Sequence, residues 1–176
     1  QSCHVSFCCL GTTLKRAGSE EGLRQVDLDY VLAFARAARA ANAQRFVFVS
    51  CVGADLKSKQ LTLRVKGEVE QALEALRFAS LDIMQPGPLL GFRRDVRPAE
   101  LAATLFMPLL NPVFTGTRLA SRGIHARTVA AAMLGASRTG RRGVYRYTYP
   151  SLRALAEAKP VRSGSPVNPK AQSGVR

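Results

Sequence analysis

The chain has 176 residues, 47% of them hydrophobic, which suits one domain with a substantial core and excludes a wholly disordered protein. No apolar run approaches the ~20 residues that a membrane-spanning helix needs. The apolar residues 1–10 lack the basic start and the small-residue cleavage site of a signal peptide.

The net charge of +14 is unevenly distributed along the sequence. Residues 1–100 carry 14 basic and 11 acidic groups, whereas residues 101–176 carry 12 basic groups and one acid, Glu157. Such asymmetry is found in proteins that bind nucleic acid or acidic membranes. Here the basic residues are scattered and no aromatic residues interleave with them. We therefore favour an arginine-rich surface with a disordered basic tail over residues 159–176, and we expect neither nucleic acid nor a membrane as partner.

The cysteines and histidines argue against a metal site. With only His4 and His125 available, no convincing ligand set can be assembled, so we expect no bound metal. The four cysteines are predicted to be reduced, buried thiols of a cytoplasmic protein. They are Cys3, Cys8, Cys9 and Cys51.

The first part of the chain predicts a strand and then a helix. His4–Leu10 reads as a strand, and the small, hydroxyl-bearing turn Gly11-Thr12-Thr13 at its end would let a ligand approach the backbone. Leu14–Gly22 is polar and is predicted to be a loop. Asp27 is a plausible N-cap for a helix that continues to Ala41.

The stretch from Arg45 to Leu76 contains the candidate site. The apolar run that begins at Arg45 and ends at Ser50 is typical of a strand buried on both faces. Apolar residues at spacings of four and three then predict a helix over residues 61–76. Thr62 and Lys66, four residues apart, share one face of this helix. Ser50 would therefore face Thr62 and Lys66 at a strand's carboxyl end, where open α/β sheets bind ligands.

The second half of the chain is less regular. His125, near the start of a predicted helix, could contact a substrate, although such residues are more often partly exposed loop histidines. The expected elements are a strand over residues 78–84, a rigid loop over 85–88, a short helix over 99–105, a helix over 124–136, a strand over 143–149 and a short helix ending at 157. Alternation of strands and helices favours right-handed crossovers and an α/β, three-layer parallel sheet.

Several short motifs together resemble a known family. CCLGTT spans residues 8–13, SCVGAD residues 50–55, VKGEVE residues 65–70 and QPGPLLG residues 85–91. In this order and spacing they resemble the atypical short-chain dehydrogenase/reductases, in particular the NAD(P)H-binding group similar to the Tat-interacting oxidoreductase-like protein. The resemblance implies a Rossmann-like domain over residues 1–158, incomplete at its N-terminus. The first three strands of the family fold and its glycine-rich pyrophosphate loop are not found.

The resemblance also implies roles for particular residues. Ser50 would take the place of the catalytic serine, which donates a hydrogen bond to a substrate carbonyl. Lys66 would bind the ribose of NADP or NAD and would lower the pKa of a catalytic tyrosine. That tyrosine position is occupied by Thr62. The residues expected to line the cofactor are Leu10, Gly11, Thr12 and Thr13, with Pro86 and Gly87 near the nicotinamide.

The threonine at the tyrosine position predicts impaired catalysis. A phenol has a pKa of about 10 and can be made more acidic by a nearby ammonium, whereas an alkanol is a far poorer acid. Loss of a positioned general acid typically costs ~10²–10⁴ in rate. The partners implied are a nicotinamide dinucleotide and a carbonyl-type small molecule, with a protein partner or homodimer also possible. The alternatives are a non-catalytic scaffold on the same fold and, less favoured, a basic protein that associates with nucleic acid or membranes.

Overall fold

A computed structural model describes residues 4–90 and 122–158 of the chain. A four-stranded sheet lies at its centre, with the strand order β1-β2-β3-β6. All three pairings in this sheet are parallel, as the sequence predicted. The strands are β1 (Val5–Cys8), β2 (Arg45–Val49), β3 (Ser80–Met84) and β6 (Gly143–Tyr147).

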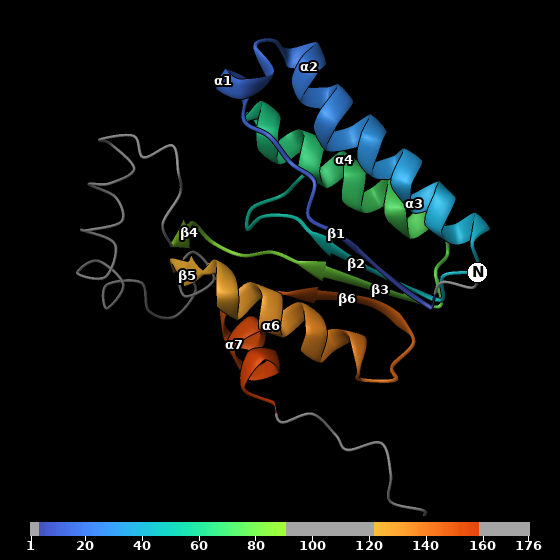
Figure 1. Cartoon of the computed structure of the whole chain (residues 1–176). Helices are drawn as coiled ribbons and strands as arrows, with labels where there is room; N and C mark the ends of the chain where they lie inside the picture. The colour runs from blue at the N-terminus through green and yellow to red at the C-terminus, as the bar shows by residue number, and fades with distance from the viewer. Residues whose placement is uncertain (1–3, 91–121, 159–176) are drawn as a thin grey trace, which may run out of the picture.

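Helices cover both faces of the sheet, so the predicted three-layer Rossmann-like α/β architecture is confirmed (Figure 1). One face carries α1 (Leu14–Ala17), α2 (Glu20–Arg24), the π-helical turn η1 (Gln25–Asp29), α3 (Tyr30–Ala40) and α4 (Leu61–Ala75). The other face carries α6 (Ala126–Ser137) and α7 (Tyr149–Glu157). A separate two-stranded parallel sheet, which the sequence did not predict, joins β4 (Leu89–Leu90) to β5 (Ile124–His125).

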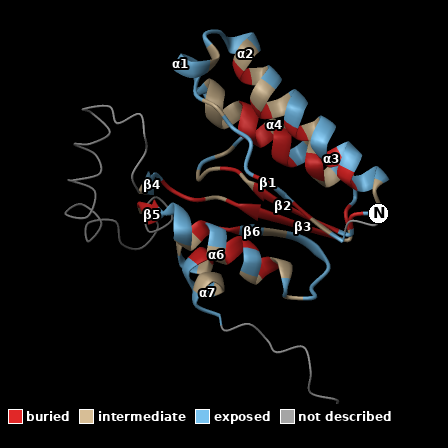
Figure 2. Cartoon of the chain, viewed as in Figure 1, coloured by how far each residue is buried: buried red, intermediate tan, exposed pale blue. Residues whose placement is uncertain are grey.

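The alternation of side chains along β2 supplies apolar groups to both layers of the core. Phe46 and Phe48 pack with Val69 of α4 on one face, whereas Val47 packs with Met133 of α6 on the other. The central strands β2 and β3 are therefore buried between the two helical layers (Figure 2). This double burial explains why the sequence of β2 is continuously apolar rather than alternating.

Several boundaries differ from the sequence prediction. Residues 14–22, predicted to be a loop, contain α1 and the start of α2, because Thr13 and Ser19 accept hydrogen bonds from the first turns of these helices. Asp27 is not an N-cap, since it lies inside a helical stretch that begins at Glu20. Tyr149 begins α7 instead of ending a strand. The predicted helix over 99–105 and the predicted tail over 159–176 lie outside the described residues.

The edge of the sheet at β1 exposes apolar and thiol side chains. Phe7 is 40% exposed, and Leu10, just beyond the strand, is 42% exposed. Cys8 is buried, but Cys9 is exposed and Cys51 is half-buried, so the expectation that all cysteines are buried was wrong for Cys9 and Cys51. Cys3 lies outside the described residues. Cys8, Cys9 and Cys51 are free thiols.

A buried ion pair joins the sheet to the layer formed by α6. The Arg45 guanidinium lies 3.3 Å from the carboxylate of Asp82, and both side chains are almost fully buried. Arg45 also donates to the backbone oxygen of Ala136 at the end of α6 and to that of Arg141 in the following loop. Asp82 accepts a hydrogen bond from the hydroxyl of Tyr147 at 2.9 Å. Burial, followed by this contact, raises the pKa of Tyr147 far above its ordinary value.

Replacing Asp82 with leucine should therefore destabilise the fold. The substitution leaves the buried Arg45 guanidinium without its counter-ion, a defect that costs about 3–5 kcal/mol. The free energy of unfolding, measured by urea titration, should fall by that amount. The exposed pair Arg153–Glu157 is the control, because Glu157→Leu should change the free energy by only about 0.5 kcal/mol. Equal effects of the two substitutions would contradict this account of the core.

Candidate functional site

The carboxyl ends of the parallel strands bring the candidate residues to one edge of the sheet. The loop after β1 contains Gly11 and Thr12, Ser50 follows β2, and Pro86 follows β3. The helix α4 begins at the same edge, because it follows the loop that leaves β2 (Figure 1). This edge is the position at which open α/β sheets bind ligands.

A buried ion pair forms the first part of the site. The ammonium nitrogen of Lys66 lies 3.2 Å from Oδ2 of Asp27, and the two side chains are 9% and 1% exposed. The other carboxylate oxygen of Asp27 accepts a hydrogen bond from the backbone N–H of Thr12 at 2.6 Å. Lys66 also donates to the backbone oxygen of Leu10 at 3.5 Å and lies over the ring of Phe48. Asp27 thus connects the loop after β1 to α4.

Two glycines permit the close approach of backbone to these groups. A Cβ atom at Gly11 would lie 3.3 Å from the ammonium nitrogen of Lys66, so a side chain there would crowd the ion pair. A Cβ atom at Gly67 would lie 2.7 Å from backbone atoms of Asp55 and Leu56. Gly67 therefore lets the loop after β2 lie directly on α4. The glycines of the CCLGTT and VKGEVE motifs have a physical reason in this packing.

A second polar cluster surrounds Glu70, one helical turn after Lys66. The hydroxyl of Ser50 donates to Oε1 of Glu70 at 2.5 Å, and both residues are buried. The side-chain amide of Gln85 donates to the same carboxylate at 3.0 Å. Arg146 of β6 contributes an ion pair at 3.0 Å. The hydroxyl of Ser50 therefore donates its hydrogen bond within the protein, to the carboxylate of Glu70.

The structure brings most of the predicted site residues to this edge. Ser50 and Lys66 flank Cys51, and burial raises the pKa of the Cys51 thiol while the Lys66 charge opposes the shift. Thr62 is partly exposed in the first turn of α4. Pro86 and Gly87 are buried beyond β3, and the backbone oxygen of Pro86 accepts from Val52. Thr13 has a local structural role, because its hydroxyl caps the N-terminus of α1.

Sequence reasoning missed the acidic partners of the site. Asp27 was interpreted as a helix cap, and Glu70 was not selected at all. A signal for Glu70 was present, because a carboxylate that follows Lys66 by four residues lies on the same helix face. Gln85 and Arg146 carried no comparable signal, since they reach Glu70 only through the folding of the sheet.

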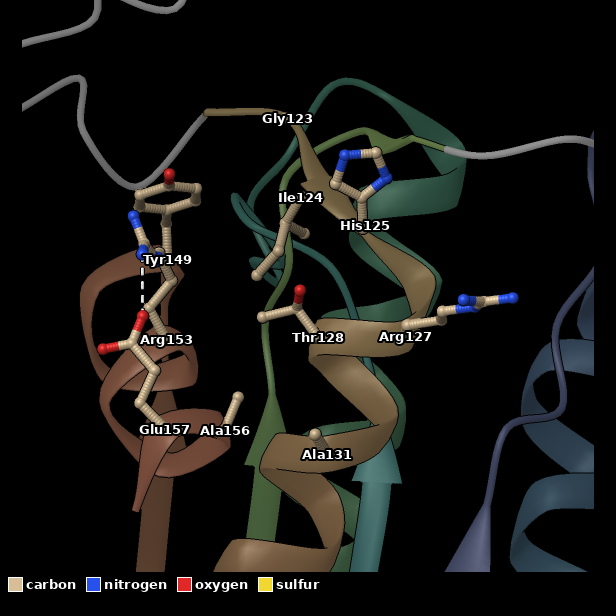
Figure 3. A pocket seen from close by; sticks show the side chains of 10 residues that line it. All are labelled: Gly123, Ile124, His125, Arg127, Thr128, Ala131, Tyr149, Arg153, Ala156 and Glu157. Atoms are coloured by element: carbon tan, nitrogen blue, oxygen red, sulfur yellow. Dashed lines mark hydrogen bonds and ion pairs between the residues drawn. The ribbon is translucent and has the colours of Figure 1, made fainter. Parts of the chain in front are cut away.

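A separate hollow of about 500 Å³ lies between α6 and α7, on the other face of the sheet from α4 (Figures 1 and 3). Ile124, Ala131 and Ala156 contribute apolar lining, and the ion pair between Arg153 and Glu157 lies along one side. His125 is exposed and lines this hollow, whereas Ser50 and Lys66 do not line it.

Within residues 4–90 and 122–158, no group of three His, Cys, Asp or Glu side chains could hold a metal ion. In the same part of the chain, no helix has the length and apolar character needed to cross a bilayer.

Comparison with known proteins confirms the resemblance predicted from the motifs. The chain is 47% identical to Protein HTATIP2 of Rattus norvegicus over 102 residues, which are 58% of this chain and 42% of that protein. It is 40% identical over 114 residues to the mitochondrial protein fmp52 of Emericella nidulans, covering 65% of this chain and 49% of that protein. The chain thus spans less than half the length of these relatives. No family model matches the chain.

A solved structure with a similar fold is the UDP-N-acetylglucosamine 4-epimerase of Methanobrevibacter ruminantium, in complex with UDP-N-acetylmuramic acid. The TM-score is 0.59 at 14% sequence identity, covering 82% of this chain and 55% of that chain. At this identity the likeness supports the fold alone.

The predicted cytoplasmic location is contradicted, because several relatives similar to this chain are named as mitochondrial proteins.

Replacing Lys66 with methionine should destabilise the site from within. The buried carboxylate of Asp27 would then have no counter-ion, which costs about 3–5 kcal/mol. Adding Asp27→Asn to this variant should recover part of the loss, since the buried charge is then removed as well. Urea unfolding of the single and double variants measures both effects, with exposed Lys57→Met as the control. A double variant less stable than Lys66→Met alone would contradict the pairing.

Proposed function

We propose that this chain is an NAD(P)-binding, oxidoreductase-like protein of the atypical short-chain dehydrogenase/reductase type, with impaired catalysis. The observation that carries this proposal is the buried contact of Lys66 with the loop after β1, joined through Asp27 at the carboxyl ends of the strands. The similarity to HTATIP2 and fmp52 supports it. The names of the fmp52 relatives also support a mitochondrial location.

The residues of this edge fit part of a dinucleotide site. Leu10, Gly11 and Thr13 are exposed and Thr12 is half-buried, so a ligand could approach this backbone. Lys66 would hold the ribose hydroxyls, and Pro86 with Gly87 would lie near the nicotinamide. The cofactor, NADP or NAD, would supply the hydride for reduction of a carbonyl-type compound. No G-x-x-G-x-x-G sequence follows β1 in this chain, so binding of the pyrophosphate should be weak.

Two features of the site support impaired catalysis. Thr62, at the place of the family's tyrosine, is a poor acid and is too short to reach the position of a phenol oxygen. The hydroxyl of Ser50 donates a hydrogen bond to Glu70 at 2.5 Å. This charge-assisted hydrogen bond would have to break before Ser50 could donate to a substrate. The hydrogen-bond donors at this edge are therefore used mainly within the protein and less for binding a ligand.

A second candidate function is a non-catalytic scaffold on the same fold. The network of Ser50, Glu70, Gln85 and Arg146 favours it, because this network connects β2, α4, β3 and β6 and uses the Ser50 hydroxyl within the protein. The partner of such a scaffold would be a protein or a second copy of the chain. The two candidates differ in whether cofactor binds and whether restoring a phenol restores turnover.

Titration with NADPH and NADH, followed by nicotinamide fluorescence, tests the proposed site. We expect weak, saturable binding that Lys66→Met lowers by at least about tenfold, the loss of a hydrogen bond to a charged group. The matched control Lys57→Met, in the exposed loop after β2, should bind as the unchanged protein does. No saturable binding of either nucleotide would contradict cofactor binding by this chain. Binding that both variants retain would contradict the assigned position.

The variant Thr62→Tyr tests the cause of impairment. It places a phenol one helical turn before Lys66, so we expect reductase activity towards a panel of carbonyl compounds to rise by about 10²-fold or more over the unchanged chain. NADPH oxidation followed by absorbance measures it, with Leu63→Tyr as a control on a different helix face. Turnover by the unchanged chain would contradict the scaffold. No gain from Thr62→Tyr, in a variant that binds cofactor, would contradict the view that Thr62 alone limits catalysis.

A further inference from the structure

The amino-end of the sheet carries a group of exposed arginines that the sequence did not reveal. The helices α3, α4 and α6 end at this edge of the sheet, and the loop between α6 and β6 lies there as well (Figure 1). The arginines are at or just beyond these helix ends or in this loop, and all are exposed. We call them the arginine face: Arg39, Arg77, Arg138, Arg141 and Arg142.

Specific contacts bring these residues to one end of the molecule. Arg39, at the end of α3, donates to the backbone oxygen of Leu76 at the end of α4, next to Arg77. The backbone N–H of Gly143 donates to Ala79, so the loop that carries Arg142 lies beside the segment that follows Arg77. The members of the arginine face therefore lie at the same end of the sheet, although they are up to about a hundred positions apart in the sequence.

The α6–β6 loop is held in place by the core. The buried guanidinium of Arg45 donates hydrogen bonds to the backbone oxygens of Ala136 and Arg141. Arg141 stacks 4.5 Å from the ring centroid of Tyr145 and donates to the hydroxyl of Tyr147. A fixed loop loses little conformational entropy when its cations meet a partner.

The arginine face has no acidic partner among the described residues. The surface ion pairs of this part of the chain, Arg24–Glu68, Arg146–Glu74 and Arg153–Glu157, do not involve its members. Helix ends attract cations, and this attraction accounts for the contact of Arg39 with a terminal carbonyl. The same attraction applies to Arg138, the C-cap residue of α6, but not to Arg142, which lies in the following loop.

We propose that the arginine face binds the phosphate groups of an anionic lipid surface, a partner that the scattered basic residues of the sequence did not lead us to expect. Guanidinium groups bind phosphate oxygens in a bidentate manner, and basic clusters of four to eight residues are typical of such association. The exposed Val144, next to this loop, adds an apolar contact. Nucleic acid fits less well, because no free aromatic ring accompanies the arginines: Tyr145 lies under Arg141, and Phe78 is buried.

Co-sedimentation with vesicles tests the proposal on the full chain. The probe is a vesicle of equal parts phosphatidylcholine and phosphatidylserine, compared with phosphatidylcholine alone. The variant Arg77→Glu/Arg138→Glu/Arg142→Glu changes residues that make no described side-chain contact. Its matched control, Lys15→Glu/Lys57→Glu/Lys59→Glu, makes the same change of charge at the opposite end of the sheet. Thermal unfolding of both variants verifies that they are folded.

We expect the unchanged chain to bind the anionic vesicles only, and binding to weaken steeply between about 50 and 500 mM salt. The arginine variant should lose at least about 100-fold in partition coefficient, roughly fivefold for each cation, whereas the control should lose much less. An equal loss in both variants would show that net charge alone acts and would overturn the proposal. Binding to neutral vesicles, absence of binding at low salt, or binding only to duplex DNA would overturn it as well.

Discussion

The buried pair between Asp27 and Lys66 is the contact on which the candidate site depends. Burial of two charges costs several kcal/mol each, and the cost is offset only when both are paired and hydrogen-bonded. Asp27 meets this requirement by using one oxygen for Lys66 and the other for the N–H of Thr12. The pair therefore fixes three segments at once: the loop after β1, the turn η1 and the helix α4.

The π-helical turn explains how Asp27 reaches this position. A π-turn inserts one extra residue into a helix and changes the direction of the side chains that follow. Asp27 and α3 can thus serve different partners: the carboxylate faces Lys66, whereas Val31 and Ala35 face the sheet. Such turns are frequent at functional sites, and they persist where tertiary contacts compensate for the poorer helix geometry.

The fold could be predicted from the sequence because the signals in the sequence are local and mutually consistent. The spacing of Val65, Val69 and Leu73 predicted the buried side of α4, and the apolar run of β2 predicted a strand buried on both faces. Alternation of strands and helices then left a parallel sheet as the simplest arrangement. Boundaries were less certain where short polar helices follow a strand, as in α1 and α2, because two N-caps within seven residues look like a loop.

The candidate site was predictable only for residues that carry a motif. Lys66 and Gly11 were identified in this way, and the fold places them in contact range of each other. The partners that decide their chemistry were not identified. Arg146 reaches Glu70 across 76 positions of sequence, and no periodicity encodes such a contact. Asp27 resembled a helix cap because aspartate before an apolar helix usually is one, and only the tertiary ion pair distinguishes the two roles.

The parallel sheet also gives the molecule two chemically different ends. At the carboxyl edge, the cations Lys66 and Arg146 are neutralised by Asp27 and Glu70, so the site presents little net charge in spite of its polar groups. At the amino edge, helix C-termini carry partial negative charge that favours arginine but places no carboxylate opposite it. Five of the chain's cations therefore lie where no carboxylate of the described residues pairs with them. One consequence is that a ligand in the crevice and a polyanion at the arginine face would not compete, because the sheet separates them.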